Sequence, residues 1–111
     1  MGLYDSTTYI DDIDFAIQNA PWLECFEGKS IFITGATGLI GSAIADIILR
    51  YNEWHKANIR VYLAGRTKNK VINRFSKYIS ANFCAHIEYD ATHKNQLPDS
   101  IDYIIHAASN A

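Results

Sequence analysis

The spacing of apolar residues changes several times along the chain, and each change indicates a new element of secondary structure. In residues 10–20 the apolar positions recur every three or four residues, which predicts a helix that ends before Pro21. They are Ile10, Ile13, Ile17 and Ala20. The acidic residues of this helix, Asp11, Asp12 and Asp14, are expected on its solvated face.

A strand-like run and a helix-like run follow each other directly in residues 30–48. SIFIT (30–34) has three consecutive large apolar residues, two of them β-branched, which predicts a short buried strand. After three glycines, a helical spacing returns and predicts an amphipathic helix. Its expected apolar face consists of Ile40, Ala43, Ile44, Ile47 and Ile48.

The alternation continues to the end of the chain. We predict a strand at 59–65, a helix at 69–81, a short strand at 86–90, a loop containing Pro98, and a fourth strand near 102–107. Alternating strands and helices imply a parallel sheet.

The predicted fold class is therefore α/β. It is the N-terminal half of a Rossmann-type doubly wound parallel sheet, in strand order 3-2-1-4, preceded by an N-terminal helix. We divide the chain into a helical extension (1–28) and a truncated dinucleotide-binding half-domain (29–111) whose C-terminal substrate part is absent.

The glycines at 35, 38 and 41 stand between the first strand and its helix. Backbone N–H groups at a helix N-terminus, together with the helix dipole, attract a phosphate, and a glycine lets the phosphate approach closely. We expect Gly35 to permit the tight turn, Gly38 to allow that approach, and Gly41 to let the helix pack closely. Thr37 is expected to be the N-cap or a phosphate ligand, and Leu39 and Ile40 complete the expected loop.

Two alternatives concern this loop. Its spacing is G-x-x-G-x-x-G and not the usual G-x-G-x-x-G, so a glycine-rich turn without a ligand stays open. EGKS (27–30) ends like a Walker A loop, but Leu23 stands where that loop needs its first glycine. We interpret EGKS as a turn before the first strand.

Composition narrows the function classes. The net charge of −2 argues against a nucleic-acid partner. Cys25 and Cys84 form no CxxC pattern, which favours a reducing compartment, and no signal peptide precedes them; we expect a cytoplasmic protein. Glycines interrupt the longest apolar stretch, so no membrane partner is expected.

ITGATGLIGS (33–42) resembles the cofactor loop of the short-chain dehydrogenase/reductase superfamily, whose pattern is T-G-x-x-G-x-x-G. The resemblance implies that Asp90, followed by Ala91, contacts the adenine after the third strand. YIIHAAS (103–109) resembles the H-x-A-A signature of the extended branch, the nucleotide-sugar epimerases and dehydratases. It implies that Ala107, Ala108 and Ser109 line the cofactor near its nicotinamide half, with a structural role for His106 or a role in supporting the residues around the site.

The choice between NAD and NADP depends on the end of the second strand, LAGRT. NAD enzymes usually place an acidic residue there for the ribose hydroxyls, whereas an arginine accommodates the 2′-phosphate of NADP. Gly65 occupies the acidic position and Arg66 follows it, which favours NADP. Some NAD-dependent members of the extended branch also carry an arginine nearby, so both cofactors stay open, as does a merely solvated Arg66.

The catalytic pair of the family, Tyr-x-x-x-Lys, does not occur in the chain. We therefore expect an N-terminal fragment, inactive by itself, of an NAD(P)-dependent nucleotide-sugar epimerase, dehydratase or decarboxylase. A nucleotide sugar would be the substrate of the full-length protein. The alternatives are a non-catalytic NAD(P) sensor or regulatory module, and an interaction domain without a ligand. An unpaired edge of the fourth strand predicts a homo-oligomer.

Overall fold

A parallel sheet of four strands forms the centre of the computed structural model, which describes residues 2–89, 97–98 and 100–107. The elements in chain order are η1 (Leu3–Asp5), α1 (Thr7–Gln18), η2 (Pro21–Phe26), β1 (Ser30–Thr34), α2 (Leu39–His55), β2 (Arg60–Gly65), α3 (Lys68–Arg74), β3 (Cys84–Glu88) and β4 (Tyr103–His106). The strand order is β3-β2-β1-β4, and every pairing is parallel. The α/β fold, the order 3-2-1-4 and the preceding helix are thus confirmed.

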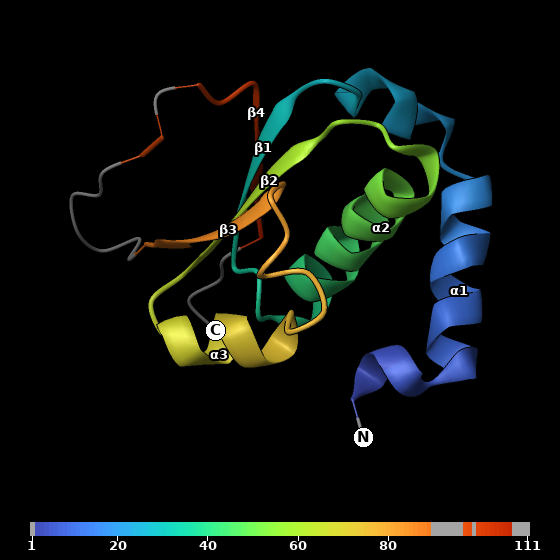
Figure 1. The fold of residues 1–111 in the computed structure, drawn as a ribbon, viewed down its shortest axis with the longest axis horizontal. Helices are drawn as coiled ribbons and strands as arrows, with labels where there is room; N and C mark the ends of the chain where they lie inside the picture. Colours follow the sequence, from blue (N-terminus) through green and yellow to red (C-terminus); the bar gives the residue numbers. More distant parts are fainter. Residues whose placement is uncertain (1, 90–96, 99, 108–111) are drawn as a thin grey trace.

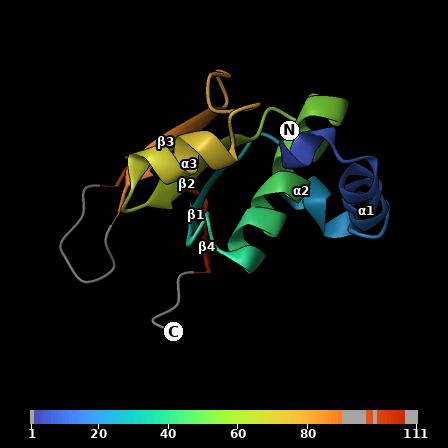
Figure 2. The same ribbon diagram turned by 90° about the horizontal axis from the view of Figure 1, so that it is seen from below.

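The sheet carries its helices on one face (Figures 1 and 2). Ile31 and Ile33 of β1 share one buried cluster with Ile48 of α2 and Phe75 after α3, and each is fully buried. Phe32 points to the opposite face, where its ring lies 5.6 Å from that of Tyr89 and its exposure is 1%. The consecutive apolar residues of β1 are therefore buried on both faces, as a central parallel strand requires.

The N-terminal segment forms a further layer outside α2 (Figure 2). Helix α1 packs against α2 through Ile13, which is buried, and the partly buried Ile17. Its N-cap is Ser6, whose Oγ accepts the N–H of Tyr9 at 3.2 Å. The helix begins at Thr7, earlier than predicted, and ends at Gln18, before Pro21 as predicted. Pro21 itself begins the 3-10 helix η2, whose Leu23 is fully buried.

The buried face of α2 differs from the predicted apolar face. Ile40 is 69% exposed, and Ile44 and Ile47 are only partly buried. The buried residues are Gly41, Ser42, Ala45, Asp46, Ile48, Leu49, Tyr51 and Asn52. Because α2 lies between the sheet and α1, it buries small and polar residues on two sides, and a single apolar stripe does not describe it.

The other boundaries shift by one or a few residues from those predicted. Helix α3 stops at Arg74, whereas 69–81 was expected to be helical; turns replace its second half, although Phe75 and Tyr78 still enter the core. Strand β3 begins at Cys84 and not at 86. Asn52 joins the end of α2 to the start of β2: its side chain donates to the carbonyl of Ile59 at 3.0 Å and accepts that residue's N–H at 2.8 Å.

Several aromatic and acidic residues lie outside the sheet. Trp22 and Trp54 are 48% and 67% exposed, whereas Phe26 packs against the core. Asp11 and Asp12 are exposed as expected. Asp14 instead pairs with Arg50, which donates to it at 2.5 and 3.0 Å and lowers the pKa of its carboxyl.

Candidate functional site

The candidate site is the loop between β1 and α2, at the carboxyl edge of the sheet. β1 lies between β2 and β4, so the chain order along the sheet reverses beside it. In open α/β sheets ligands bind outside the carboxyl ends of the strands at this reversal. The glycine loop, Arg66 after β2 and Ala107 after β4 all follow carboxyl ends of neighbouring strands.

Gly35 makes the sharp turn out of β1. Its φ of +65° lies in the left-handed region, which glycine adopts without steric cost. The carbonyl of Gly35 then accepts the N–H of Gly38 at 3.0 Å, while the N–H of the fully buried Ala36 reaches the carbonyl of Ala64 in β2 at 3.5 Å. The predicted tight turn is confirmed, and it is tied to the neighbouring strand.

Gly41 lies against the turn that Gly35 makes. A Cβ on Gly41 would stand 2.0 Å from the carbonyl oxygen of Gly35 and 3.3 Å from the Cβ of Ala107. A real Cβ never comes so near a backbone oxygen, so the close packing of α2 requires glycine here. This was the role predicted for Gly41, and it also brings the end of β4 next to the first turn of α2.

The first turn of α2 presents backbone donors toward this edge. The N-cap is Gly38, whose carbonyl accepts the N–H of Ser42 at 2.9 Å; the prediction of Thr37 as N-cap is therefore wrong, while its role as a phosphate ligand stays a prediction. The N–H groups of Leu39, Ile40 and Gly41 have no acceptor within the helix, because the first turn never does. The side chains of Leu39 and Ile40 lie in solvent at this turn, 89% and 69% exposed, whereas Gly41 is buried.

Arg66 is exposed and follows the last residue of β2. It is followed by Thr67, the N-cap of α3. β2 pairs directly with β1, so Arg66 and the glycine loop leave adjacent strands at the same edge. This is the location that the NADP prediction requires.

The end of β4 is joined to the end of β1. Thr34 Oγ1 lies 2.8 Å from His106 Nδ1, and the carbonyl of Thr34 accepts the N–H of Ala107 at 3.2 Å. His106 thus contacts a residue of the neighbouring strand, and its role at the site stays a prediction. The remaining predicted cofactor residues, Asp90, Ala91, Ala108 and Ser109, lie outside the described residues.

A buried carboxylate in α2 was missed by sequence reasoning. Asp46 is 2% exposed and bonds to Tyr4, Tyr9 and Arg74, which come from three other elements. Its signal in the sequence is a single acidic residue between apolar Ala45 and Ile47 on a predicted helix. Its partners are distant in sequence, so no local pattern identifies them.

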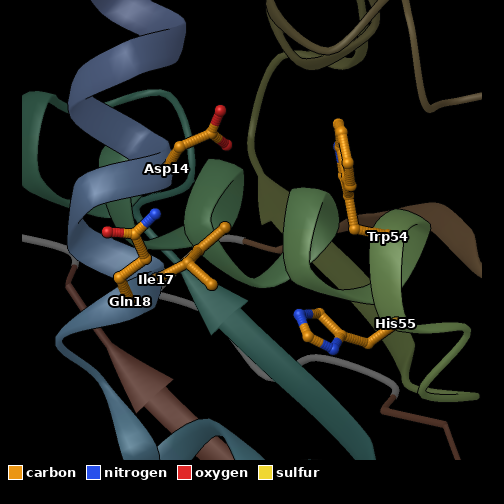
Figure 3. A pocket seen from close by; sticks show the side chains of 5 residues that line it. All are labelled: Asp14, Ile17, Gln18, Trp54 and His55. Carbon is orange, nitrogen blue, oxygen red and sulfur yellow. The ribbon is translucent and has the colours of Figure 1, made fainter.

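A hollow between α1 and the end of α2 lies away from the loop (Figure 3). Its volume is about 210 Å³, and Asp14, Ile17 and Gln18 face Trp54 and His55 across it. Trp54 is 15 residues beyond the first residue of α2, which is roughly 22 Å along a helix that rises 1.5 Å per residue. This hollow is therefore separate from the glycine loop.

Comparison with protein-family models, with curated proteins and with solved structures finds no match to this chain. Within the described residues, no cluster of histidine, cysteine or acidic side chains could hold a metal ion. The described helices include none with the length and apolarity needed to cross a membrane.

Proposed function

We propose that this chain binds the pyrophosphate of a nicotinamide dinucleotide, NAD or NADP, at the β1–α2 loop. The observation that carries the proposal is the turn at Gly35, which leads within four residues from the central strand β1 of a parallel sheet into the N-terminus of the 17-residue helix α2. A helix N-terminus in this position suits a dianionic diphosphate, since its N–H groups and dipole both favour negative charge.

The loop has the shape that a phosphate would need. Neither Gly35 nor Gly38 carries a Cβ to cover the backbone, and α2 can pack on the turn only because residue 41 is also glycine. The exposed side chains of Leu39 and Ile40 offer apolar surface beside the backbone donors. A dinucleotide, with flat rings on either side of a charged centre, combines these two requirements.

The resemblance to the extended short-chain dehydrogenases and reductases extends the proposal. It supports the proposal that this chain is part of an NAD(P)-dependent enzyme acting on nucleotide sugars, as an epimerase, dehydratase or decarboxylase. A second candidate is a dinucleotide sensor without chemistry of its own. Both candidates predict dinucleotide binding, and both predict no turnover from the 111-residue chain alone.

Calorimetric titration with NAD and NADP tests the proposal. We expect saturable binding that Gly38→Asp weakens by about tenfold or more, because an added carboxylate repels the diphosphate by roughly 1.4 kcal/mol. The φ of −72° and ψ of 168° at Gly38 suit aspartate as an N-cap. Its Cβ would stand 3.3 Å from the carbonyl oxygen of Gly35, so the turn must shift by a few tenths of an ångström while α2 is retained.

Ser80→Asp adds the same charge at an exposed turn and serves as the control. It should leave the affinity unchanged. Absence of binding by the unaltered chain, or equal losses in the two variants, would contradict dinucleotide binding at this loop.

A further inference from the structure

Four elements meet at the carboxylate of Asp46, and we call Tyr4, Tyr9, Asp46 and Arg74 the Asp46 cluster. Tyr4 of η1 donates its hydroxyl to Oδ1 at 2.6 Å, and Tyr9 of α1 donates to Oδ2. Arg74, the last residue of α3, donates from Nη2 to Oδ2 at 2.6 Å and from Nη1 to the Tyr4 hydroxyl at 3.1 Å. One side chain of α2 thus holds the N-terminal segment and α3 together.

Asp46 is buried at the centre of the cluster, and its three partners are partly buried around it. Asp46 is 2% exposed, and the Arg74 side chain is 20% exposed. Burial, with the hydrogen bond and charge of Asp46, raises the pKa of Tyr9 to about 12, so its phenol stays a donor at neutral pH. Burial opposes the Arg74 charge, but the bond to Asp46 outweighs it and raises the pKa of Arg74.

Stability alone does not account for such a cluster. Removing two charges from water costs several kcal/mol, and well-packed apolar side chains often stabilise as well or better. What a cluster of charges and hydroxyls adds is geometry, because each member is satisfied in one arrangement only. The arrangement that this cluster defines is the position of α2 relative to α3 and the N-terminal segment.

That position matters at the glycine loop. Gly41 lies five residues before Asp46 on α2, roughly 7.5 Å along the helix. Its backbone is pressed against the Gly35 carbonyl, so a shift of α2 must move the turn. At the other end of the link, α3 begins just after Arg66 and Thr67.

We propose that the Asp46 cluster is a positioning device for the dinucleotide site, through which the N-terminal segment 3–18 sets the dinucleotide affinity of the β1–α2 loop. The inference rests on the proposed function. Tyr4, Tyr9, Asp46 and Arg74 are positioning residues: they act through α2 and α3 and not by contact with the ligand.

The test compares Tyr9→Phe and Asp46→Asn with the matched variant Tyr51→Phe in the full chain. Tyr51 also lies on α2 and also donates its hydroxyl to a carboxylate, that of Glu27 at 2.9 Å, but it is no member of the cluster. Two measurements are made: amide hydrogen exchange of Ala36, Gly38 and Ser42 without any cofactor, and the calorimetric affinity for NAD. The N–H groups of these three residues are hydrogen-bonded in and beside the turn, so their exchange rates report its opening.

We expect Tyr9→Phe and Asp46→Asn to speed exchange in the loop and to weaken NAD binding by about 2- to 30-fold, the range that such couplings span. Tyr51→Phe should change neither measurement, even where its thermal midpoint falls as far as that of Tyr9→Phe. If the loss of NAD affinity is proportional to the fall in thermal midpoint in all three variants, Tyr51→Phe included, the cluster has only a structural role and the inference is overturned.

The two proposals fail in different ways. If the unaltered chain binds no dinucleotide, the proposed function fails and the affinity claim falls with it, while the exchange rates still decide whether the cluster positions the loop. If the unaltered chain binds NAD and neither cluster variant changes exchange or affinity, only the positioning role is overturned. Tyr9→Phe removes one hydroxyl and keeps the ring, so it supplies the answer should Asp46→Asn not fold.

Discussion

Gly41 has no space for a side chain, because the Gly35 carbonyl oxygen lies 2.0 Å from where its Cβ would stand. Gly41→Ala must therefore displace the helix or the turn, and we expect the free energy of unfolding to fall by about 1–3 kcal/mol, the usual cost of overpacking. Urea denaturation measures this loss. Gly2→Ala, where no atom lies within 4 Å of the added Cβ, is the control and should be neutral. An equally stable Gly41→Ala chain would contradict the close packing of α2 on the turn.

Arg66 determines the predicted choice between the two dinucleotides. Its guanidinium would meet the 2′-phosphate of NADP through charge-assisted hydrogen bonds worth about 1.5–3 kcal/mol each. Arg66→Ala should then weaken NADP binding by roughly tenfold or more and leave NAD binding nearly unchanged. Calorimetry with both dinucleotides measures the difference, and Lys70→Ala, which removes an exposed cation from α3, is the control. Equal losses for NAD and NADP would show that Arg66 does not recognise the 2′ position.

At the scale of elements, the N-terminal segment should loosen in alkali. Burial and Asp46 raise the pKa of Tyr9 from 10.0 to about 12 in the folded chain. Between these values the unfolded chain loses the phenolic proton and the folded chain keeps it, so stability falls as the pH rises. Below pH 10 the contribution is fully present. Urea unfolding across this window should show the decline, and Tyr9→Phe should make it shallower; an identical slope in the variant would contradict the assignment to Tyr9.

Periodicity predicted the elements well because their burial follows simple rules. SIFIT matches β1 residue for residue, since a central parallel strand is buried on both faces and reads as a continuous apolar run. The glycine loop was predictable for the same reason, because only glycine fits where Gly35 and Gly41 meet. Sequence and structure agree wherever one residue type is forced by its immediate neighbours.

The buried face of α2 and the Asp46 cluster could not be predicted in this way. Asp46 is buried because Tyr4 and Tyr9, 42 and 37 residues earlier, supply its hydrogen bonds. Ile40, by contrast, is exposed because it stands at the open first turn of the helix. The spacing of apolar residues cannot predict a hydrogen-bond donor that is distant in sequence, nor where along a helix its packed surface ends.

At the scale of the whole molecule, β4 forms one edge of the sheet, and its Tyr103 and Ile104 are 41% and 57% exposed. An accessible edge with apolar side chains favours association between copies. We expect a mass above the 12.5 kDa of one chain by light scattering at tens of micromolar. Ile104→Lys should lower that mass, since an edge lysine opposes strand pairing. A monomeric mass for the unaltered chain would contradict self-association.

The place of β4 in the sheet also has a consequence for how the chain folds. β1 and β2 pair after a single intervening helix, whereas Ser30 and Asp102, which bond at 2.8 Å where β1 meets β4, are 72 residues apart. Contacts so distant in sequence form slowly, and they form last during synthesis on the ribosome. In a nascent chain, β1, β2 and β3 can pair before β4 has been synthesised. The backbone edge of β1 at Phe32, which pairs with Ile104 in the folded protein, is then still unpaired. Until then β1 is an apolar edge strand, a surface that favours pairing with other chains.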